Sequence, residues 1–528
     1  MATSEEQNPN PNPEKPPEEE EEQDPEENGD DELDYDDDDD LDEEEEDEDE
    51  TPSSQREKLQ TLFRRLSSGP VRIRVHDVII KGNNRTDESL IEAEVLEAFR
   101  SAETMQELLR AASVANVRLQ RLDVFDSVSI TLDAGPQELP GTANVVIEVL
   151  EPKNPLTGDI GVFSKPEAKT WSLEGSLKLK NPFGYADIWD LSGSYGWDQT
   201  TEVSAGVSLP RFKAIPTPLS ARVSLLSQDW LKFSSYKEHL LGVSFGLLST
   251  RNHDLAYSLT WRHLTDPLRM ASKSTRRQLG HSLLSSIKYT YKLDRRDSQM
   301  RPTKGYAFLT STQVSGLGPD SKALRFIRQE FDLRAALPLG FLNSALNFGV
   351  AAGAIMPWGS GFRTLPSPLP DRFHIGGSTS PVCTLGGPTS LLGFRTRGLG
   401  PTDLRRLIPR TSDDPDSQSS PELDVLGGDI AITAFADLSF DLPLEILRKT
   451  GIHGHVFATA GNLAKITEGE INSFSLQNLW STARSSIGIG MIVPTKLFRM
   501  EINYCHILKK SEQDRAKTGV QFSFSATS

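Results

Sequence analysis

Apolar and polar residues alternate with a period of two through most of the chain beyond Pro152. In residues 171–180 the apolar positions include Trp171, Leu173 and Leu177, and serine, glutamate or lysine stands between them. The same alternation returns in residues 189–197, 255–262, 346–354, 430–440, 487–493, 498–504 and 520–524. Because successive side chains of a strand point to opposite faces, each stretch predicts a strand with one apolar and one polar face.

The second face of these strands carries charge, which changes the choice of fold class. The charged positions are Glu174, Lys178, Lys180, Arg222, Lys288, Arg328, Glu330, Asp332 and Arg334. A soluble β-sandwich also alternates, but its two inner faces are filled by large apolar side chains. A membrane barrel has a lipid face and a wet lumen, and aromatic residues gather at its two interfaces. Aromatics stand near predicted strand ends at Trp171, Trp189, Trp197, Trp230, Tyr306 and Trp358.

We therefore predict a mainly β protein with a transmembrane antiparallel β-barrel over residues 153–528. Spanning strands of about 9–11 residues with their turns would give this length roughly 16 strands. No run of about 18 apolar residues marks a transmembrane helix.

The barrel follows a segment with a different pattern, residues 71–151. Apolar positions with helical spacing predict helices over residues 86–99 and 104–122, the first capped by Thr86 or Asp87. Alternation predicts strands over residues 71–80, 128–132 and 144–149. The order of strand, helix, helix, strand, strand predicts one compact α+β domain.

The charge of the chain divides at about residue 50. Residues 1–50 hold 29 of the 76 Asp and Glu residues and a single lysine, whereas the remainder is mildly basic within a net charge of −20. We expect a disordered acidic tail over residues 1–52 and a linker over residues 53–70. The tail has no apolar signal-peptide core. It is either a solvated extension or an electrostatic lure for basic segments.

Candidate chemistry is sparse. Gly242 to Gly246 fits the nucleophile-elbow pattern around Ser244, but the alternation runs straight through it, so we expect a lumen-facing strand serine. Cys383 and Cys505 are too few for a disulfide framework, and the nine histidines lack the spacing of a zinc protease. We predict no enzyme activity, no cofactor, no metal and no nucleic-acid partner.

A glycine-rich, basic stretch over residues 371–401 is too long for a hairpin turn. It is either flexible surface or a loop folded into the lumen, where glycines allow tight turns and arginines meet acidic wall residues.

Three motifs together give the chain a family resemblance. Residues 122–128 resemble the signature that precedes the second strand of a POTRA domain. Residues 293–297 with 302–305 resemble a strand boundary of the outer-membrane protein-assembly superfamily, and residues 373–394 resemble its inward-folded sixth loop. The resemblance implies one POTRA domain followed by a 16-stranded barrel. A single such domain is most like the mitochondrial branch, since plastid-envelope relatives usually carry more.

The chain departs from the family at the loop and at the wall it meets. The usual Arg-Gly-Phe tip reads Leu392-Gly393-Phe394, and the wall motif Phe-x-Asp-x-Gly has Thr459 in place of the acid. The usual salt bridge is thereby lost, and either Arg395 or Arg397 could substitute. The candidate site residues are the loop's Gly386, Gly387, Gly393, Phe394, Arg395 and Arg397 and the wall's Phe457, Thr459 and Gly461.

The resemblance further implies a function in the mitochondrial outer membrane, where such proteins insert β-barrel precursors by strand addition. The implied lateral gate lies between a first strand with Trp171, Gly175 and Leu177 and a last strand with Gly519, Phe522 and Phe524. The last strand also resembles the sorting signal of client proteins. Implied partners are β-barrel precursors, accessory subunits of an assembly complex and outer-membrane lipid.

Three rivals stay open at this stage. One is a polypeptide-translocating pore, as in the chloroplast outer envelope. The others are a metabolite pore and a soluble β-rich binding protein.

Overall fold

The computed structural model describes residues 72–139, 141–165, 170–211, 217–318, 325–359, 366–383, 385–406, 422–466, 475–495 and 498–526. The predicted tail, residues 1–52, and linker, residues 53–70, lie outside these ranges.

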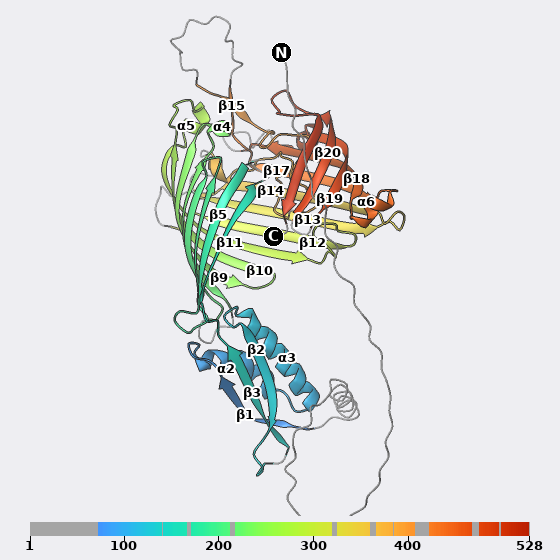
Figure 1. The fold of residues 1–528 in the computed structure, drawn as a ribbon. Helices are drawn as coiled ribbons and strands as arrows, with labels where there is room; N and C mark the ends of the chain where they lie inside the picture. The colour runs from blue at the N-terminus through green and yellow to red at the C-terminus, as the bar shows by residue number, and fades with distance from the viewer. Residues whose placement is uncertain are drawn as a thin grey trace, which may run out of the picture. The chain divides into compact units, whose positions relative to one another are not determined.

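The segment that follows is an α+β unit with the predicted order of elements. Its strands are β1 (Arg74–Lys81), β2 (Ser127–Ala134) and β3 (Thr142–Leu150), and its helices are α2 (Glu88–Arg100) and α3 (Met105–Arg121). The sheet order is β1-β3-β2, with β1 parallel and β2 antiparallel to β3 (Figure 1). The helices bury their apolar stripes against β3 in a core that includes Ile91, Val95, Leu108, Leu119, Val145 and Ile147.

Side chains cap both helices at the places where the sequence predicts that they begin. The Asp87 carboxylate accepts the N–H of Ser89. At α3 the Thr104 hydroxyl accepts the N–H of Glu107, and the Glu107 carboxylate accepts the N–H of Glu103, the residue before the cap, in a variant of the capping box. The bond from the Glu103 backbone lowers the pKa of Glu107.

The described residues from Leu156 to Ala526 contain one continuous sheet of 16 antiparallel strands, in which each strand pairs with the next strand of the sheet along the chain (Figure 1). Its strands are β4 (Leu156–Lys165), β5 (Thr170–Lys180), β6 (Ile188–Gly196), β7 (Thr201–Leu209), β8 (Leu219–Asp229), β9 (Lys237–Ser249), β10 (His253–Thr265), β11 (Gly280–Asp294), β12 (Gly305–Ser315), β13 (Phe326–Pro338), β14 (Ala345–Pro357), β17 (Ile430–Asp441), β18 (His453–Ala464), β19 (Arg484–Pro494), β20 (Phe498–Lys509) and β21 (Gly519–Ala526). The predicted fold class and the predicted strand number are confirmed.

Short elements lie in the connections between these strands. They are the helices α4 (Leu231–Ser234), α5 (Lys273–Arg276), α6 (Glu445–Lys449) and α7 (Leu476–Ser481), the 3-10 helix η2 (Leu369–Asp371) and the ribbon of β15 (Thr402–Leu404) and β16 (Leu423–Val425). Among the described residues, no helix has both the length and the apolar character needed to cross a membrane.

One prediction about the strands is wrong. Residues 171–180 are not the first strand of the sheet, because β4 precedes them and pairs with β5 along its whole length. Trp171, Gly175 and Leu177 therefore lie in the second strand.

The two faces of the sheet differ as the alternation predicts. Large apolar side chains on one face are exposed, among them Leu173, Leu191, Val223, Phe245, Leu259, Phe331 and Val350. Charged and polar side chains on the other face are buried, among them Glu238, Arg262, Asp332, Arg334, Asp437, Arg499 and Glu501. Exposed apolar atoms outside and buried charges inside fit a wall between lipid and an occupied lumen. These 16 strands form a single sheet and not a two-sheet sandwich.

The aromatic positions divide into two groups. Trp171, Trp189, Trp197 and Tyr306 are exposed, as an interfacial girdle requires. Trp230 and Trp358 are instead partly buried under arginines, since the Arg397 guanidinium lies 3.6 Å from the Trp230 ring centroid and that of Arg325 lies 5.6 Å from Trp358. Trp230 therefore belongs to the interior contacts described next.

Candidate functional site

Residues 366–383 and 385–406 between β14 and β17, here called the inward loop, pack against the inner face of the sheet. Its residues Ile375, Leu391 and Phe394 are almost fully buried, and they form one apolar cluster with Leu284 of β11, Phe326 of β13 and Leu463 of β18. The reading of residues 371–401 as flexible surface is therefore wrong. The loop fills lumen space that a strand wall alone would leave to water.

Two of the predicted loop glycines bind an aspartate of the wall. The N–H groups of Gly386 and Gly387 both donate to the same Asp332 carboxylate oxygen, at 3.1 and 3.3 Å. The Asp332 carboxylate also accepts two bonds from the Arg334 guanidinium, at 2.9 and 2.8 Å. Gly387 has a φ of +83°, which an L side chain rarely adopts. The glycine is needed so that the backbone itself becomes the ligand of the carboxylate.

The loop tip meets all three residues of the predicted wall motif. Leu392 packs with Phe457 and Cys505 in a small apolar cluster. The Ser486 hydroxyl donates to the Leu392 carbonyl at 2.5 Å and lies 2.9 Å from the Thr459 hydroxyl. A methyl group added at Gly461 would come within 3.5 Å of the Leu391 side chain. The structure thus brings the predicted wall and tip residues together.

Neutral contacts stand where the family's ion pair would be. Leu392 occupies the place of the usual arginine, Thr459 that of the usual acid, and the link between them runs through Ser486. Arg395 is exposed, and its N–H donates to the Arg515 carbonyl. Arg397 lies over Trp230. Of the two candidate substitutes, Arg397 is thus the one packed against the interior, through an aromatic ring of the β8–β9 connection.

This arrangement gives a direct prediction for Ser486. In Ser486→Ala the Leu392 carbonyl and the Thr459 hydroxyl both lose a buried partner, so we expect a loss of about 1–3 kcal/mol of folding free energy. Urea unfolding of the reconstituted barrel, followed by tryptophan fluorescence, measures it. Ser244→Ala is the control, because that hydroxyl makes one long contact of 3.5 Å on an exposed position. Equal stability of the two variants would contradict the role of the hydroxyl link.

Further contacts hold the stem of the loop, and these contacts are not predicted from the sequence. The Arg262 guanidinium of β10 donates to both carboxylate oxygens of Asp371 at 2.7 and 3.2 Å, and it also pairs with Glu238 of β9 at 2.9 Å. Arg372 binds the Ser367 carbonyl and hydroxyl. These buried charges are compensated by partners on the loop, so loop and wall form one polar interior.

The tip also touches the last strand and the turn before it. Gly393 N–H donates to the Gln521 side chain of β21 at 3.2 Å, and Lys517 N–H donates to the Gly393 carbonyl at 2.8 Å. Phe394 is nearly fully buried and forms an isolated β-bridge with Ala516. Gly393 has a φ of +91°, so this glycine also sits where other residues would be strained. The loop position is thereby linked to the edge of the sheet.

The sheet has two edges in the described residues. β4 pairs on one side with β5, β21 pairs on one side with β20, and no pairing joins β4 to β21. In β21, Gly519 has a φ of +129°, Phe522 is exposed on the outer face, and Phe524 lies in register with Met500. The edges thus carry backbone groups that a further strand could pair with.

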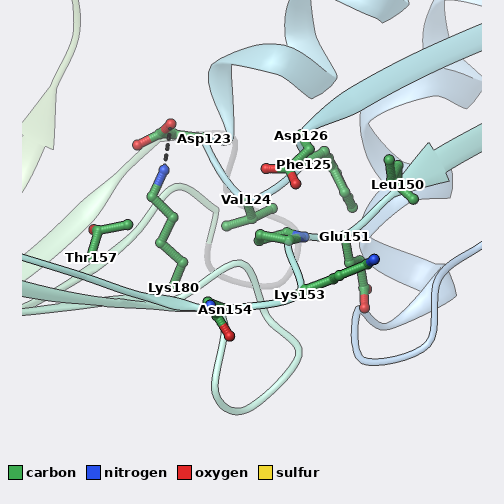
Figure 2. Close-up of a pocket in the computed structure, with 11 residues that line it drawn as sticks. Asp123, Val124, Phe125, Asp126, Leu150, Glu151, Lys153, Asn154, Thr157 and Lys180 are labelled. Carbon is green, nitrogen blue, oxygen red and sulfur yellow. Dashed lines mark hydrogen bonds and ion pairs between the residues drawn. The ribbon is translucent and has the colours of Figure 1, made fainter.

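The α+β unit lies against the beginning of the edge strand β4. A cavity of about 400 Å³ lies between the signature residues 123–126 and the start of β4, and Lys180 reaches Asp123 across it at 2.9 Å (Figure 2). Beside it, Glu151 accepts the N–H and the hydroxyl of Thr86, and the Asn181 side chain donates to the same hydroxyl. The residues of the POTRA-like signature therefore line the base of the edge strand.

The remaining candidate chemistry is placed as expected. Ser244 lies in the middle of β9 with strand residues on both sides, so the turn that a nucleophile elbow requires is not present there. Cys383 and Cys505 are both free thiols.

A 16-stranded sheet with a lipid-facing exterior, a polar interior and a loop packed inside defines an outer-membrane β-barrel. The chain belongs to the Omp85 superfamily, since residues 181–527 match the Omp85 superfamily domain. It is 30% identical over 467 residues to the sorting and assembly machinery component 50 homolog of Mus musculus, with 85% of this chain and 89% of that protein covered. The Homo sapiens homolog is 29% identical over the same shares.

The solved structures agree on the fold. BamA from Haemophilus ducreyi lacking POTRA domains 1–3 aligns with a TM-score of 0.65 at 16% identity, covering 86% of this chain and 85% of that one. This likeness concerns the fold alone. With the sequence relatives, it makes the chain a β-barrel protein of the mitochondrial outer membrane, as predicted.

Proposed function

We propose that this protein folds and inserts β-barrel precursors into the mitochondrial outer membrane by adding their strands at the edge between β4 and β21. The names of its relatives, which are sorting and assembly machinery components, support an assembly role. The proposed partners are β-barrel precursors, accessory subunits of an assembly complex and the surrounding lipid.

The observation that carries the proposal is the unclosed sheet. In lipid, unpaired backbone N–H and C=O groups cost several kcal/mol each, so a membrane barrel normally closes. The described residues leave one side of β4 and one side of β21 without a strand partner. An incoming precursor strand would satisfy these groups by β-augmentation, and its own edge would then receive the next strand.

The loop contacts fit a role in shaping this edge. Gly393 and Phe394 contact Gln521 and Ala516, one residue within β21 and one in the turn before it. The Asp332 and Ser486 anchors fix the same loop to β13 and β19. We propose that the loop holds the last strand in the register that a precursor needs. The signal-like residues Gly519, Phe522 and Phe524 would be displaced or mimicked by the client.

The interior argues against the rival translocation pore. A polypeptide passing through the lumen would have to displace a loop whose Ile375, Leu391 and Phe394 are almost fully buried and whose stem is held by the Arg262–Asp371 pair. Insertion at the edge leaves these contacts in place. Insertion at the edge therefore requires less free energy than passage through the lumen.

Site-directed disulfide crosslinking to an arrested precursor tests the route. In a Cys383→Ser, Cys505→Ser background, cysteines are placed at Ile160 on β4 and Val520 on β21, both exposed outward. The matched control is Leu177 on β5, which is similarly exposed but is flanked by strands on both sides. A lumen position is represented by Glu174.

We expect crosslinks from the precursor's terminal strands to positions 160 and 520, with several-fold weaker products at 177 and 174. Products confined to position 174 would reject edge insertion and favour a pore. Equal products at all four positions would show that the precursor has no preferred strand.

A further inference from the structure

Two connections at one end of the sheet expose large apolar side chains to an unusual degree. The turn between β13 and β14 exposes Leu339, Phe341 and Leu342, and the segment that leads into and forms α6 exposes Leu444 and Ile446. Leu342 is 62% exposed and Ile446 is 78% exposed. We call these five residues the interfacial patch. Connections facing water normally carry polar residues, so this composition calls for an apolar surrounding.

Backbone contacts hold the two connections together. Asp441 N–H donates to the Leu342 carbonyl at 3.0 Å, and the Asn343 side chain donates to the Asp441 carboxylate at 3.3 Å. The two segments are thus one surface feature, although about a hundred residues separate them in sequence.

The turn between β13 and β14 has a leucine in a backbone conformation that leucine disfavours. Leu342 has a φ of +46°, a left-handed conformation in which leucine is strained and glycine or asparagine is favoured. A polar turn residue would remove the strain and the exposed apolar surface together. A strained and exposed leucine is accounted for when its side chain contacts an apolar surrounding outside the described residues.

The helix points to the same conclusion. α6 has five residues, none of them buried, and no side chain caps its beginning. Isolated helices this short are unstable in water, because nucleation costs more than a single turn returns. Its Ile446 is exposed and its Leu447 is only partly buried, so the described protein covers little of this helix and a stabilising partner lies outside it.

The position of the patch identifies that partner. On β13 the outward row of Phe331, Leu333 and Leu337 is exposed, and the exposed Leu339 and Phe341 follow in the turn directly after the strand ends at Pro338. This row belongs to the lipid-facing wall, so the patch extends a surface that already contacts lipid. Strand direction alternates along the sheet, which places both connections at the end where β4 begins.

We infer that the interfacial patch is a membrane anchor that inserts into the phospholipid headgroup region at the barrel end where β4 begins. The apolar side chains enter the acyl boundary, and the exposed Arg448 and Lys449 at the end of α6 contact lipid phosphates. The anchor fixes the depth of the β13–β18 wall in the bilayer.

Fluorescence depth measurements on the purified full-length chain test the anchor without any precursor, so the outcome is independent of the proposed insertase function. Single cysteines at Leu342 and Ile446, in the Cys383→Ser, Cys505→Ser background, are labelled with an environment-sensitive fluorophore. The protein is reconstituted into vesicles of phosphatidylcholine and phosphatidylinositol, and headgroup-region spin-labelled lipid is the quencher. Leu333 serves as the lipid-facing reference, and Leu139, a similarly exposed leucine of the α+β unit, serves as the aqueous reference.

We expect blue-shifted emission at positions 342 and 446, as at 333, and loss of most of the fluorescence at 342 and 446 on quenching from the headgroup region. Emission and quenching like those at 139 would overturn the inference and assign the patch to a protein partner. Because positions 342 and 446 lie on separate connections, one folded variant is enough to decide.

Discussion

Replacing Asp332 by alanine is expected to cost the barrel about 3–5 kcal/mol of folding free energy, because it leaves the buried Arg334 guanidinium without its carboxylate. The substitution also removes the acceptor of the Gly386 and Gly387 N–H groups. We therefore expect a second effect, release of the inward loop from β13 and loss of most precursor assembly. Urea unfolding of the reconstituted protein and an assembly assay with an imported precursor measure the two effects.

Two further variants separate the loop anchor from the ion pair. Asp332→Leu combined with Arg334→Met removes both charges, so stability should largely return while the loop still lacks its acceptor. Asp190→Ala is the matched surface control, since its partner Arg222 is 45% exposed and such pairs contribute about 0–1 kcal/mol. Full assembly activity in the double variant would show that the Gly386–Asp332 contact does not matter for function.

The elements that the sequence predicts well are those specified by local patterns. The period of two defines β5, β6, β10 and β17 to within a few residues, because their apolar rows face lipid without interruption. Likewise α2 and α3 begin where Asp87 and Thr104 cap them. Each of these signals is complete within a dozen neighbouring residues.

The sequence pattern does not predict β4, the first strand of the sheet, because the apolar row of this strand is interrupted. In β4 the outward row reads Leu156, Gly158, Ile160 and Val162, and a glycine in that row breaks the apolar alternation. Glycine weakens a strand and often marks a bulge or a site where another backbone approaches closely. The same glycine that hides β4 from the pattern agrees with the proposal that a precursor strand pairs with the second side of β4.

Contacts between distant residues could not be predicted from the pattern at all. The tie from Asp332 to Gly386 spans 54 residues, and that from Ser486 to Leu392 spans 94. Trp230 was expected in the aromatic girdle, yet it lies under Arg397, more than 150 residues later. The family resemblance supplied the loop and the wall motif, but only the structure shows which groups replace the lost ion pair.

The largest test of that replacement is to restore the family's charges at Leu392 and Thr459. Leu392→Arg alone puts a cation into the apolar cluster with Phe457 and Cys505, and Thr459→Asp alone puts an unpaired carboxylate at a position that is 4% exposed. Each single variant should lose about 3–5 kcal/mol of folding free energy. The double variant should recover about 1–3 kcal/mol relative to the sum, as a coupling free energy from urea unfolding.

The recovery is expected because the two positions are already joined through one side chain. Ser486 touches both the Leu392 backbone and the Thr459 hydroxyl, so an arginine at 392 lies within reach of a carboxylate at 459. Ile355→Arg with Thr459→Asp is the control pair. Ile355 is as buried as Leu392. Gly349 pairs with Phe435, and Phe435 pairs with Thr459, so these three residues lie in line across the sheet. Ile355 lies six residues further along β14, so about 20 Å separates it from Thr459. If the folding free energies lost in Leu392→Arg and Thr459→Asp simply add in the double variant, as in the control pair, the two charges do not interact. The loop tip would then have moved away from the wall motif, and the neutral contacts would do more than replace the ion pair.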